Sequence, residues 1–326
     1  MRPLAEWPVD CLLLITDHLP SERDLNAIAQ TNWRLYNIFN PYLYRHNIQR
    51  HGKTATLWWA VRYGEVNTAR LSLRAGADPN AKDSDYLGGA ALHKAIWARY
   101  ELREAYHNIT NFGGHCGVES SERYRLSIER YPLLIRVLLD NGADIHSRNR
   151  QGWTPLHKAS WLPDEELVRL LVEEGADIAA VDDHGSTPLH TAAFTGDHGV
   201  VSFLLEMGAN VHARRTDNRT TPLHEAAEQA RPAAISLLLE NGADLEARDK
   251  FGQTPLHCAA SSGTLEPLGA VIQLLIDKGA CIEAKDDRGM TPLQKVASQG
   301  HFEEVIILLT KNRANVNVRD RDGRTV

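Results

Sequence analysis

Apolar and polar positions along residues 54–326 recur in one pattern, in which two short apolar-faced stretches alternate with polar, glycine-containing turns. Leu156–Trp161 and Glu165–Glu174, for example, each carry apolar residues at the spacing typical of a helix. A single short pair of this kind can bury its apolar face only against neighbouring pairs. The pattern therefore predicts a stack of helix pairs, an α-solenoid.

Two short motifs mark the period of this pattern. Thr-Pro-Leu-His begins at four positions, a variant ending in Gln begins at Thr291, and weaker copies begin at Ala55 and Ala90; the four are Thr154, Thr187, Thr221 and Thr254. Gly-Ala-Asp or Gly-Ala-Asn follows at intervals of 33, 33 and 34 residues, beginning at Gly142, Gly175, Gly208 and Gly242. Thr suits a helix N-cap, Pro the first helical turn, and Gly the left-handed residue that ends a helix.

This motif at this period resembles the ankyrin repeat. The resemblance covers residues 54–326 and implies about seven repeats, an all-α fold with short β-hairpin-like fingers, and a role in binding other proteins. In ankyrin-like folds the motif histidine hydrogen-bonds locally to the turn; here the equivalents are His93, His157, His190, His224 and His257. The alternative, a shared metal ion, is disfavoured because equivalent atoms of adjacent repeats lie too far apart for one ligand shell.

Insertions stand out because the motif Leu normally precedes the next motif Gly by 19 residues. The separation is 50 residues between Leu92 and Gly142 and 23 between Leu256 and Gly279. We expect the larger insertion, at about 98–129, to form a helical arm from Arg99–Asn108 and Ser120–Glu129 around a glycine-rich loop. Zinc bound by His107, His115 and Cys116 is the less favoured reading, since no fourth ligand is evident. A last, truncated repeat begins at Thr325, and the sequence leaves open whether the chain is a fragment.

Residues 1–50 lack the repeat motifs and predict a separate module of three short helices. Pro8 begins the first helix, Pro20 ends it, and Leu12, Ile15 and Leu19 form one apolar stripe. Three helices of this size hold too little core to be stable alone. We therefore expect this module to dock on a partner or on the repeats.

The module resembles an F-box. The matching residues are Pro8, Leu12, Ile15, Leu19, Pro20, Asp24, Leu25, Tyr44 and Arg45, and the departures are Trp7, Asp10 and Cys11. The order F-box then ankyrin repeats is similar to that of proteins common in filamentous fungi. The resemblance implies binding to a Skp-type adaptor of a cullin–RING ubiquitin ligase through Pro8, Leu12, Ile15, Leu19 and Leu25. The alternative is that these residues form an N-terminal cap over the first repeat.

A target would bind on the concave face, whose positions can be counted from the motif histidine. This count selects six candidate target-binding residues, Trp59, Arg62, Trp97, Trp161, Phe194 and Glu228. Exposed tryptophans are enriched in binding hot spots, and contiguous exposed apolar surface marks partner sites. The alternative is that the arm of the second repeat folds over these rings and uses them as core.

Composition and missing motifs restrict the function. The net charge of −6 argues against a general nucleic-acid binder. No apolar run is long enough for a membrane span. The four cysteines form no Cys-x-x-Cys pair, and this favours a reducing compartment, the cytoplasm or the nucleus. The sequence contains no phosphate-binding loop, Gly-x-Ser-x-Gly, His-Glu-x-x-His or kinase motif. We expect a monomeric protein that is not an enzyme and has no cofactor or metal.

Taken together, these features predict a substrate-recognition adaptor of an SCF-type ubiquitin ligase. The F-box-like module would tether the chain to the ligase, and the repeats would hold a target protein near the transferring enzyme. The rival prediction is an ankyrin scaffold or inhibitor without a ligase link. A host-directed effector of similar architecture is a third reading.

Overall fold

The computed structural model describes residues 54–82, 88–111, 118–262, 268–299 and 303–325. The expected F-box-like module, with its adaptor-binding residues Pro8, Leu12, Ile15, Leu19 and Leu25, lies outside these ranges, as do His115 and Cys116 of the arm loop. The chain divides into two compact units, the first ending at Asn149 and the second beginning at Arg150.

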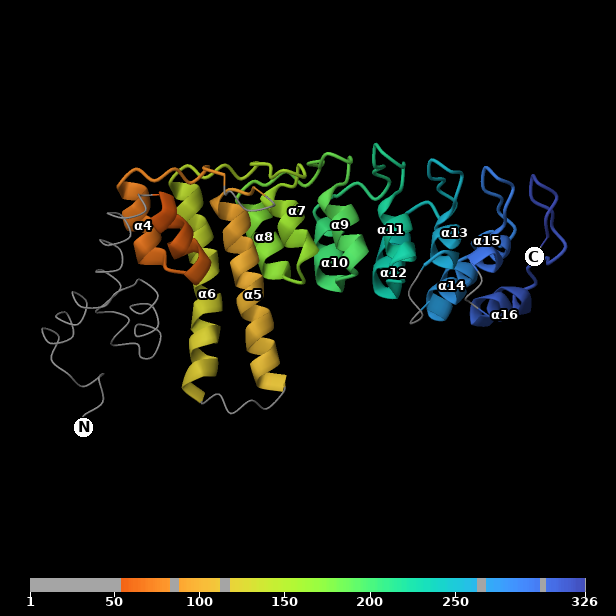
Figure 1. Cartoon of the computed structure of the whole chain (residues 1–326), viewed down its shortest axis with the longest axis horizontal. Helices are drawn as coiled ribbons and strands as arrows, with labels where there is room; N and C mark the ends of the chain where they lie inside the picture. The colour runs from red at the N-terminus through yellow and green to blue at the C-terminus, as the bar shows by residue number, and fades with distance from the viewer. Residues whose placement is uncertain (1–53, 83–87, 112–117, 263–267, 300–302, 326) are drawn as a thin grey trace, which may run out of the picture. The chain divides into compact units, whose positions relative to one another are not determined.

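The second unit is a stack of helix pairs (Figure 1). The first helix of each pair is an inner helix: α7 (Pro155–Trp161), α9 (Pro188–Thr195), α11 (Pro222–Glu228), α13 (Pro255–Ala260) and α15 (Pro292–Gln299). The second is an outer helix: α8 (Glu165–Glu173), α10 (His198–Glu206), α12 (Pro232–Glu240), α14 (Leu268–Asp277) and α16 (Glu303–Lys311). Each inner helix contacts the next inner helix, and each outer helix contacts the next outer helix. This nearest-neighbour layering is that of a solenoid.

The core of the second unit lies between these two layers. The motif leucines of the inner helices are at most 1% exposed; they are Leu156, Leu189, Leu223, Leu256 and Leu293. Outer helices contribute aliphatic residues such as Leu171, Leu204 and Leu238, which are fully buried. Burial of these side chains against neighbouring pairs supplies the main stabilisation of a short-helix fold.

The motif Thr and His residues begin four of the inner helices, α7, α9, α11 and α13, with a capping box. At α9, the backbone N–H of Thr187 donates to Nδ1 of His190 at 3.1 Å, and the Thr187 hydroxyl lies 2.9 Å from the same nitrogen. The opposite ring nitrogen, Nε2, lies 3.2 Å from the carbonyl oxygen of Thr220 in the next repeat. The local bond expected for this histidine is therefore present, and a second bond joins successive repeats.

The segments between the pairs are tight turns closed by an aspartate. In the segment of residues 177–187, Oδ1 of Asp182 accepts hydrogen bonds from the backbone N–H groups of His184 and Ser186. Neighbouring segments are joined by single backbone bonds, such as that from Thr216 to His184 at 2.8 Å. The expectation of β-hairpin-like fingers was wrong, because no strand forms in the described residues and isolated bonds of this kind build no ladder. We call these segments fingers without implying strands.

The first unit contains a helix over residues 54–63, α4 (Val66–Arg74), α5 (Ala91–Asn111) and α6 (Val118–Asp140). Helix α6 contacts both α4 and α5, and Figure 1 shows α5 and α6 side by side. The residues expected to form the helical arm lie within α5 and α6. Each of these two helices is unbroken and includes both the repeat residues and the arm residues. The fully buried Tyr131 of α6 donates its hydroxyl hydrogen to the carbonyl oxygen of Arg62 at 2.9 Å, which fixes α6 against the first helix pair.

Candidate target-binding groove

Three aromatic rings form a continuous cluster on the inner side of the second unit. The ring centroids of Trp161 and Phe194 are 5.2 Å apart with nearly parallel planes, and those of Trp153 and Trp161 are 5.6 Å apart. Trp161 is the last residue of α7 and is 38% exposed. An exposed stack of this kind is a large apolar surface available to a partner.

Trp153 is held in this cluster by the neighbouring finger. Its indole Nε1–H donates to Oδ2 of Asp182 at 3.1 Å, while Oδ1 of the same carboxylate closes the finger turn. The Lys158 ammonium lies 6.0 Å from the centroid of the Trp153 ring. One carboxylate thus fixes both the finger and the orientation of the ring.

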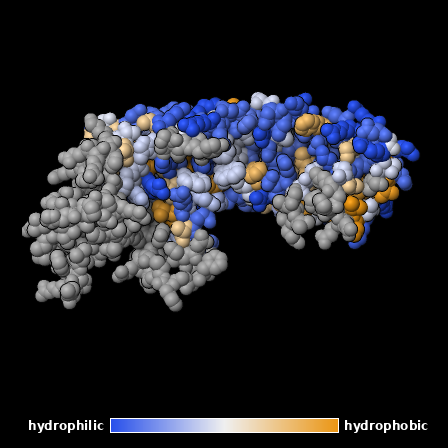
Figure 2. All heavy atoms as spheres, in the orientation of Figure 1, coloured by the Kyte–Doolittle hydropathy of each residue, from blue (hydrophilic) through white to orange (hydrophobic). Residues whose placement is uncertain are grey.

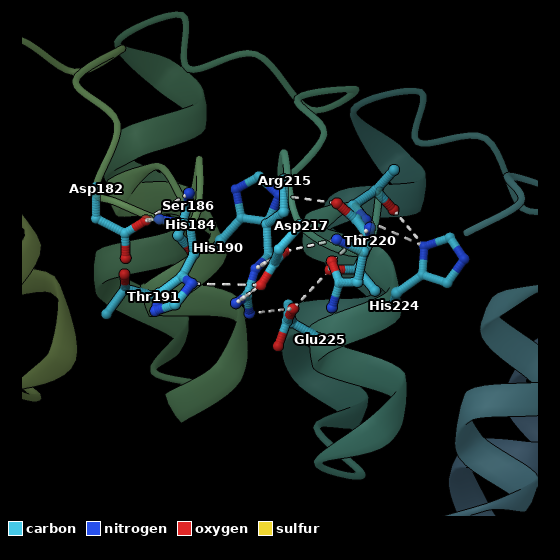
Figure 3. A network of polar contacts seen from close by, with 12 residues as sticks. Asp182, His184, Ser186, His190, Thr191, Arg215, Asp217, Thr220, His224 and Glu225 are labelled. Atoms are coloured by element: carbon cyan, nitrogen blue, oxygen red, sulfur yellow. Dashed lines mark hydrogen bonds and ion pairs between the residues drawn. The ribbon is translucent and has the colours of Figure 1, made fainter. Parts of the chain in front are cut away.

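Arg215 forms a polar wall of the same cavity that the rings line, and Figure 3 shows the polar contacts around it. Its guanidinium bonds to Asp217 at 2.9 and 3.2 Å and to Oε1 of Glu225 at 3.2 Å. The buried Glu225 carboxylate also accepts a bond from the Thr220 hydroxyl at 2.8 Å. In Figure 3 Arg215 extends from its finger toward Glu225 on α11, so the ion pair ties the finger to the helix beneath it.

The ion pair between Arg215 and Asp217 favours the charged form of both side chains. Burial alone would raise the pKa of Asp217, but hydrogen bonds and charge attraction from Arg215 hold that pKa below its usual value. The Arg215 guanidinium is ion-paired with Asp217 and with Glu225. Two carboxylates, those of Asp217 and Glu225, thus lie against the one guanidinium of Arg215.

The aromatic cluster and this polar wall line one cavity of about 220 Å³. Its lining includes Trp153, Trp161, Phe194, Thr191, Arg215 and Glu225. We call this cavity the binding groove. Its size accommodates one or two side chains of a bound protein, and Figure 2 shows that the surface along the neighbouring finger edge is mostly hydrophilic.

The structure divides the predicted target-binding residues between the two units. Trp161 and Phe194 meet in the binding groove. Glu228 lies on α11, one turn beyond Glu225, is exposed, and does not line the cavity. Trp59, Arg62 and Trp97 belong to the first unit.

In that first unit the predicted residues have local partners. The rings of Trp59 and Tyr63 are 5.2 Å apart, and Trp97 donates its indole hydrogen to Glu101 at 2.8 Å. Trp97 is 38% exposed and Arg62 is also exposed. These side chains remain candidate binding residues of the first unit.

Sequence reasoning did not select Trp153, Arg215 or Glu225 as site residues. Trp153 directly precedes the motif Thr154, where the other full motifs have Ser186, Thr220, Gln253 and Met290. A single bulky aromatic at a position otherwise occupied by smaller or flexible residues was the available signal. Arg215 lies in a charged finger that resembled any solvated turn.

Metal sites, membrane spans and disulfides can also be considered for the part of the chain that the structure describes. Within the described ranges, no three His, Cys, Asp or Glu side chains are grouped so as to hold a metal ion. Among the described helices, none combines the length and apolar character that crossing a membrane requires. The described cysteines, Cys258 and Cys281, are free.

An open groove on stacked helix pairs is typical of a protein-interaction module. Family models for ankyrin repeats match the chain at residues 127–215, 166–249, 212–286 and 275–326, and these matches together span 127–326. The chain belongs to the ankyrin-repeat proteins, which are generally interaction modules and not enzymes. No F-box model matches residues 1–50, and a comparison with curated proteins found no match.

Proposed function

We propose that this protein recognises a target protein through its ankyrin repeats and presents it to an SCF-type cullin–RING ubiquitin ligase, to which residues 1–50 bind through a Skp-type adaptor. Such an adaptor needs two binding surfaces and no catalytic groups. Tethering the target raises its effective concentration beside the transferring enzyme. This function places the protein in the cytoplasm, the nucleus or both.

The observation that carries the target-binding half is the exposed stack of Trp161 on Phe194. Two large rings lie together beside a fully paired polar wall, which is the combination of apolar centre and polar rim found at binding hot spots. Because Asp182 and Arg215 fix the groove through bonds within the chain, little conformational entropy remains to be lost on binding.

The ligase half is supported by the residue pattern of the first module. Pro8, Leu12, Ile15, Leu19 and Leu25 match the pattern of an F-box, and an apolar stripe on so small a module is expected to be covered by a partner or by the repeats. Binding to a Skp-type adaptor would cover that stripe.

The two halves can be tested separately in one experiment. Full-length chain carrying an affinity tag is recovered from cells treated with a proteasome inhibitor, and bound proteins are quantified. L12D/L19D should lose the Skp-type adaptor and cullin while retaining the targets. W161A/F194A should lose the targets while retaining the adaptor. The matched controls are L71D, at an exposed leucine of α4, and M207A, at an exposed residue that follows α10.

The second candidate function is an ankyrin scaffold or inhibitor without a ligase link, with residues 1–50 as a cap. It is favoured by the family matches, which begin at residue 127 and include no F-box. Recovery of groove-dependent targets with no Skp-type adaptor in any sample would establish this function and refute the ligase half of the proposal.

A further inference from the structure

The Phe194 ring has one face covered by a neighbouring ring and the other face directed toward the next inner helix. Trp161 and Phe194 hold equivalent positions, the fourth after the motif histidine, on the adjacent helices α7 and α9, and their rings stack. The stack therefore runs from helix to helix, and the second face of Phe194 is directed toward α11. Among the described residues, Phe194 makes no ring or cation–π contact other than that with Trp161.

The equivalent position on α11 is occupied by a carboxylate, that of Glu228. This side chain is exposed and forms no hydrogen bond or ion pair with the part of the chain that the structure describes. The inner helices are packed on one another, and packed helices are about 8–10 Å apart. Two stacked rings fill this spacing between α7 and α9, whereas one ring and one carboxylate leave room for a flat group between α9 and α11.

The charges around Glu228 are mostly negative. Burial, followed by repulsion from Glu225, raises the pKa of Glu228, and Asp249 adds to this repulsion. Arg215 opposes the effect, but its guanidinium is already shared between Glu225 and Asp217. The inner side at α11 therefore keeps an excess of negative charge, which a cation supplied by a partner would balance.

The other basic side chains near this position are placed elsewhere. Arg231, which precedes α12, donates from Nε to the carbonyl oxygen of Phe194 at 3.2 Å and forms no ion pair with Glu228. The inner helices carry two lysines and no arginine, and these lysines, Lys158 on α7 and Lys295 on α15, each lie two inner helices away from α11. The described chain thus supplies no cation of its own between Phe194 and Glu228.

We propose that the target is held by an arginine in an extended segment, with its guanidinium stacked on the free face of Phe194 and hydrogen-bonded to the Glu228 carboxylate. A guanidinium is flat, is always charged and can bond a carboxylate through two N–H groups at once, whereas the ammonium of lysine is a compact point charge. A cation over an aromatic face is attracted by the ring as well. This inference rests on the proposed use of the binding groove for target recognition.

The test uses a display library of random 16-residue peptides, with the immobilised full-length chain as the bait. Selected peptides should share an arginine. In a peptide synthesised from the consensus, replacing this arginine by citrulline, which keeps the shape without the charge, should raise Kd about tenfold. Replacing it by lysine should also weaken binding, because the flat fork is lost.

The partner of that arginine is identified by a substitution in the protein. E228Q should raise Kd for the arginine peptide about tenfold and leave Kd for the citrulline peptide nearly unchanged, since both changes remove the same interaction. The matched control E240Q, at the exposed end of α12, should leave Kd unchanged for both peptides.

The other outcomes separate the inference from the proposed function. Peptides that lose binding to W161A, but that share no arginine or bind E228Q with an unchanged Kd, would overturn the arginine inference and leave target recognition by the groove intact. Equal Kd values for the arginine and citrulline peptides would overturn it in the same way. Selection of peptides that bind W161A as well as the unchanged chain, or of no peptide at all, would overturn both.

Discussion

The Nε2 atom of His190 lies 3.2 Å from the carbonyl oxygen of Thr220, so a side chain that begins one repeat is bonded to the finger of the next. The same bond recurs from His224 to Gln253 and from His257 to Met290, at 3.1 Å each. Since Nδ1 accepts from the backbone of the motif Thr, Nε2 is the nitrogen that carries the hydrogen. The neutral ring is thus the form that joins the repeats.

This arrangement predicts loss of stability in mild acid. Burial lowers the pKa of His190 to about 4, and burial also lowers the pKa of His224 and of His257. An unfolded chain binds protons at these rings near pH 6.5. The free energy of unfolding should therefore be constant above pH 6.5 and fall as the pH decreases toward 4, by about 3 kcal/mol for a shift as large as that of His190. Urea denaturation followed by circular dichroism across this range measures it, and a flat profile would contradict the account.

The last full repeat has Gln294 at the position of the motif histidine, and a glutamine side chain does not bind a proton in this pH range. Oε1 of Gln294 accepts from the Thr291 backbone at 3.1 Å, and its Nε2–H donates to Val318 at 2.9 Å, which reproduces the histidine bonds with a group that does not titrate. H190Q should retain most of the stability at pH 7 and lose less between pH 6.5 and 4 than the unchanged chain. The reciprocal control Q294H should become more acid-sensitive. Parallel pH profiles of the three proteins would refute the assignment of the acid effect to the motif rings.

The close approach of adjacent fingers predicts a position-specific effect of adding one methyl group. Gly185 has a φ of 77°, and a Cβ there would lie 2.5 Å from the backbone nitrogen of Thr216. G185A should lower the free energy of unfolding by about 2–4 kcal/mol, since strain at positive φ and a backbone clash add together. Gly208 has a similar φ of 85° with no atom within 4 Å of the Cβ position, so G208A should cost only about 1 kcal/mol. Equal losses in chemical denaturation would show that the fingers do not approach in this way.

The Arg215 network predicts strong coupling between two charges. R215M leaves the buried Glu225 carboxylate without its cation and should destabilise the protein by about 2–4 kcal/mol. In R215M/E225L the buried Glu225 charge is removed as well, and only the exposed Asp217 carboxylate loses its cation, so the double variant should recover much of this loss. A double-mutant cycle by urea denaturation measures the coupling, and additive losses would contradict a direct interaction.

Much of the repeat architecture could be predicted because each motif residue acts locally. Thr, Pro, Leu and His determine the start and the buried face of an inner helix within four positions, and counting from the His placed Trp161 and Phe194 in one groove. The bonds from His190 to Thr220 and from Arg215 to Glu225 depend instead on how one segment lies against another. No local pattern encodes that path, which is why Arg215 was missed.

The prediction of β-hairpin-like fingers was wrong for a related reason. Asp182 closes its turn with side-chain bonds to backbone N–H groups, which satisfies groups that a strand ladder would otherwise use. A glycine-containing polar turn is compatible with both arrangements.

The measurement that tests the central claim most directly is site-specific photocrosslinking in living cells. A photoreactive amino acid replaces Trp161 in the full-length chain, or replaces Met207 on the opposite, outer side as the control. The account predicts protein adducts from position 161 that are absent from position 207 and that co-purify with a Skp-type adaptor and carry ubiquitin. Equal adducts from both positions, or none from position 161, would contradict target recognition by the groove.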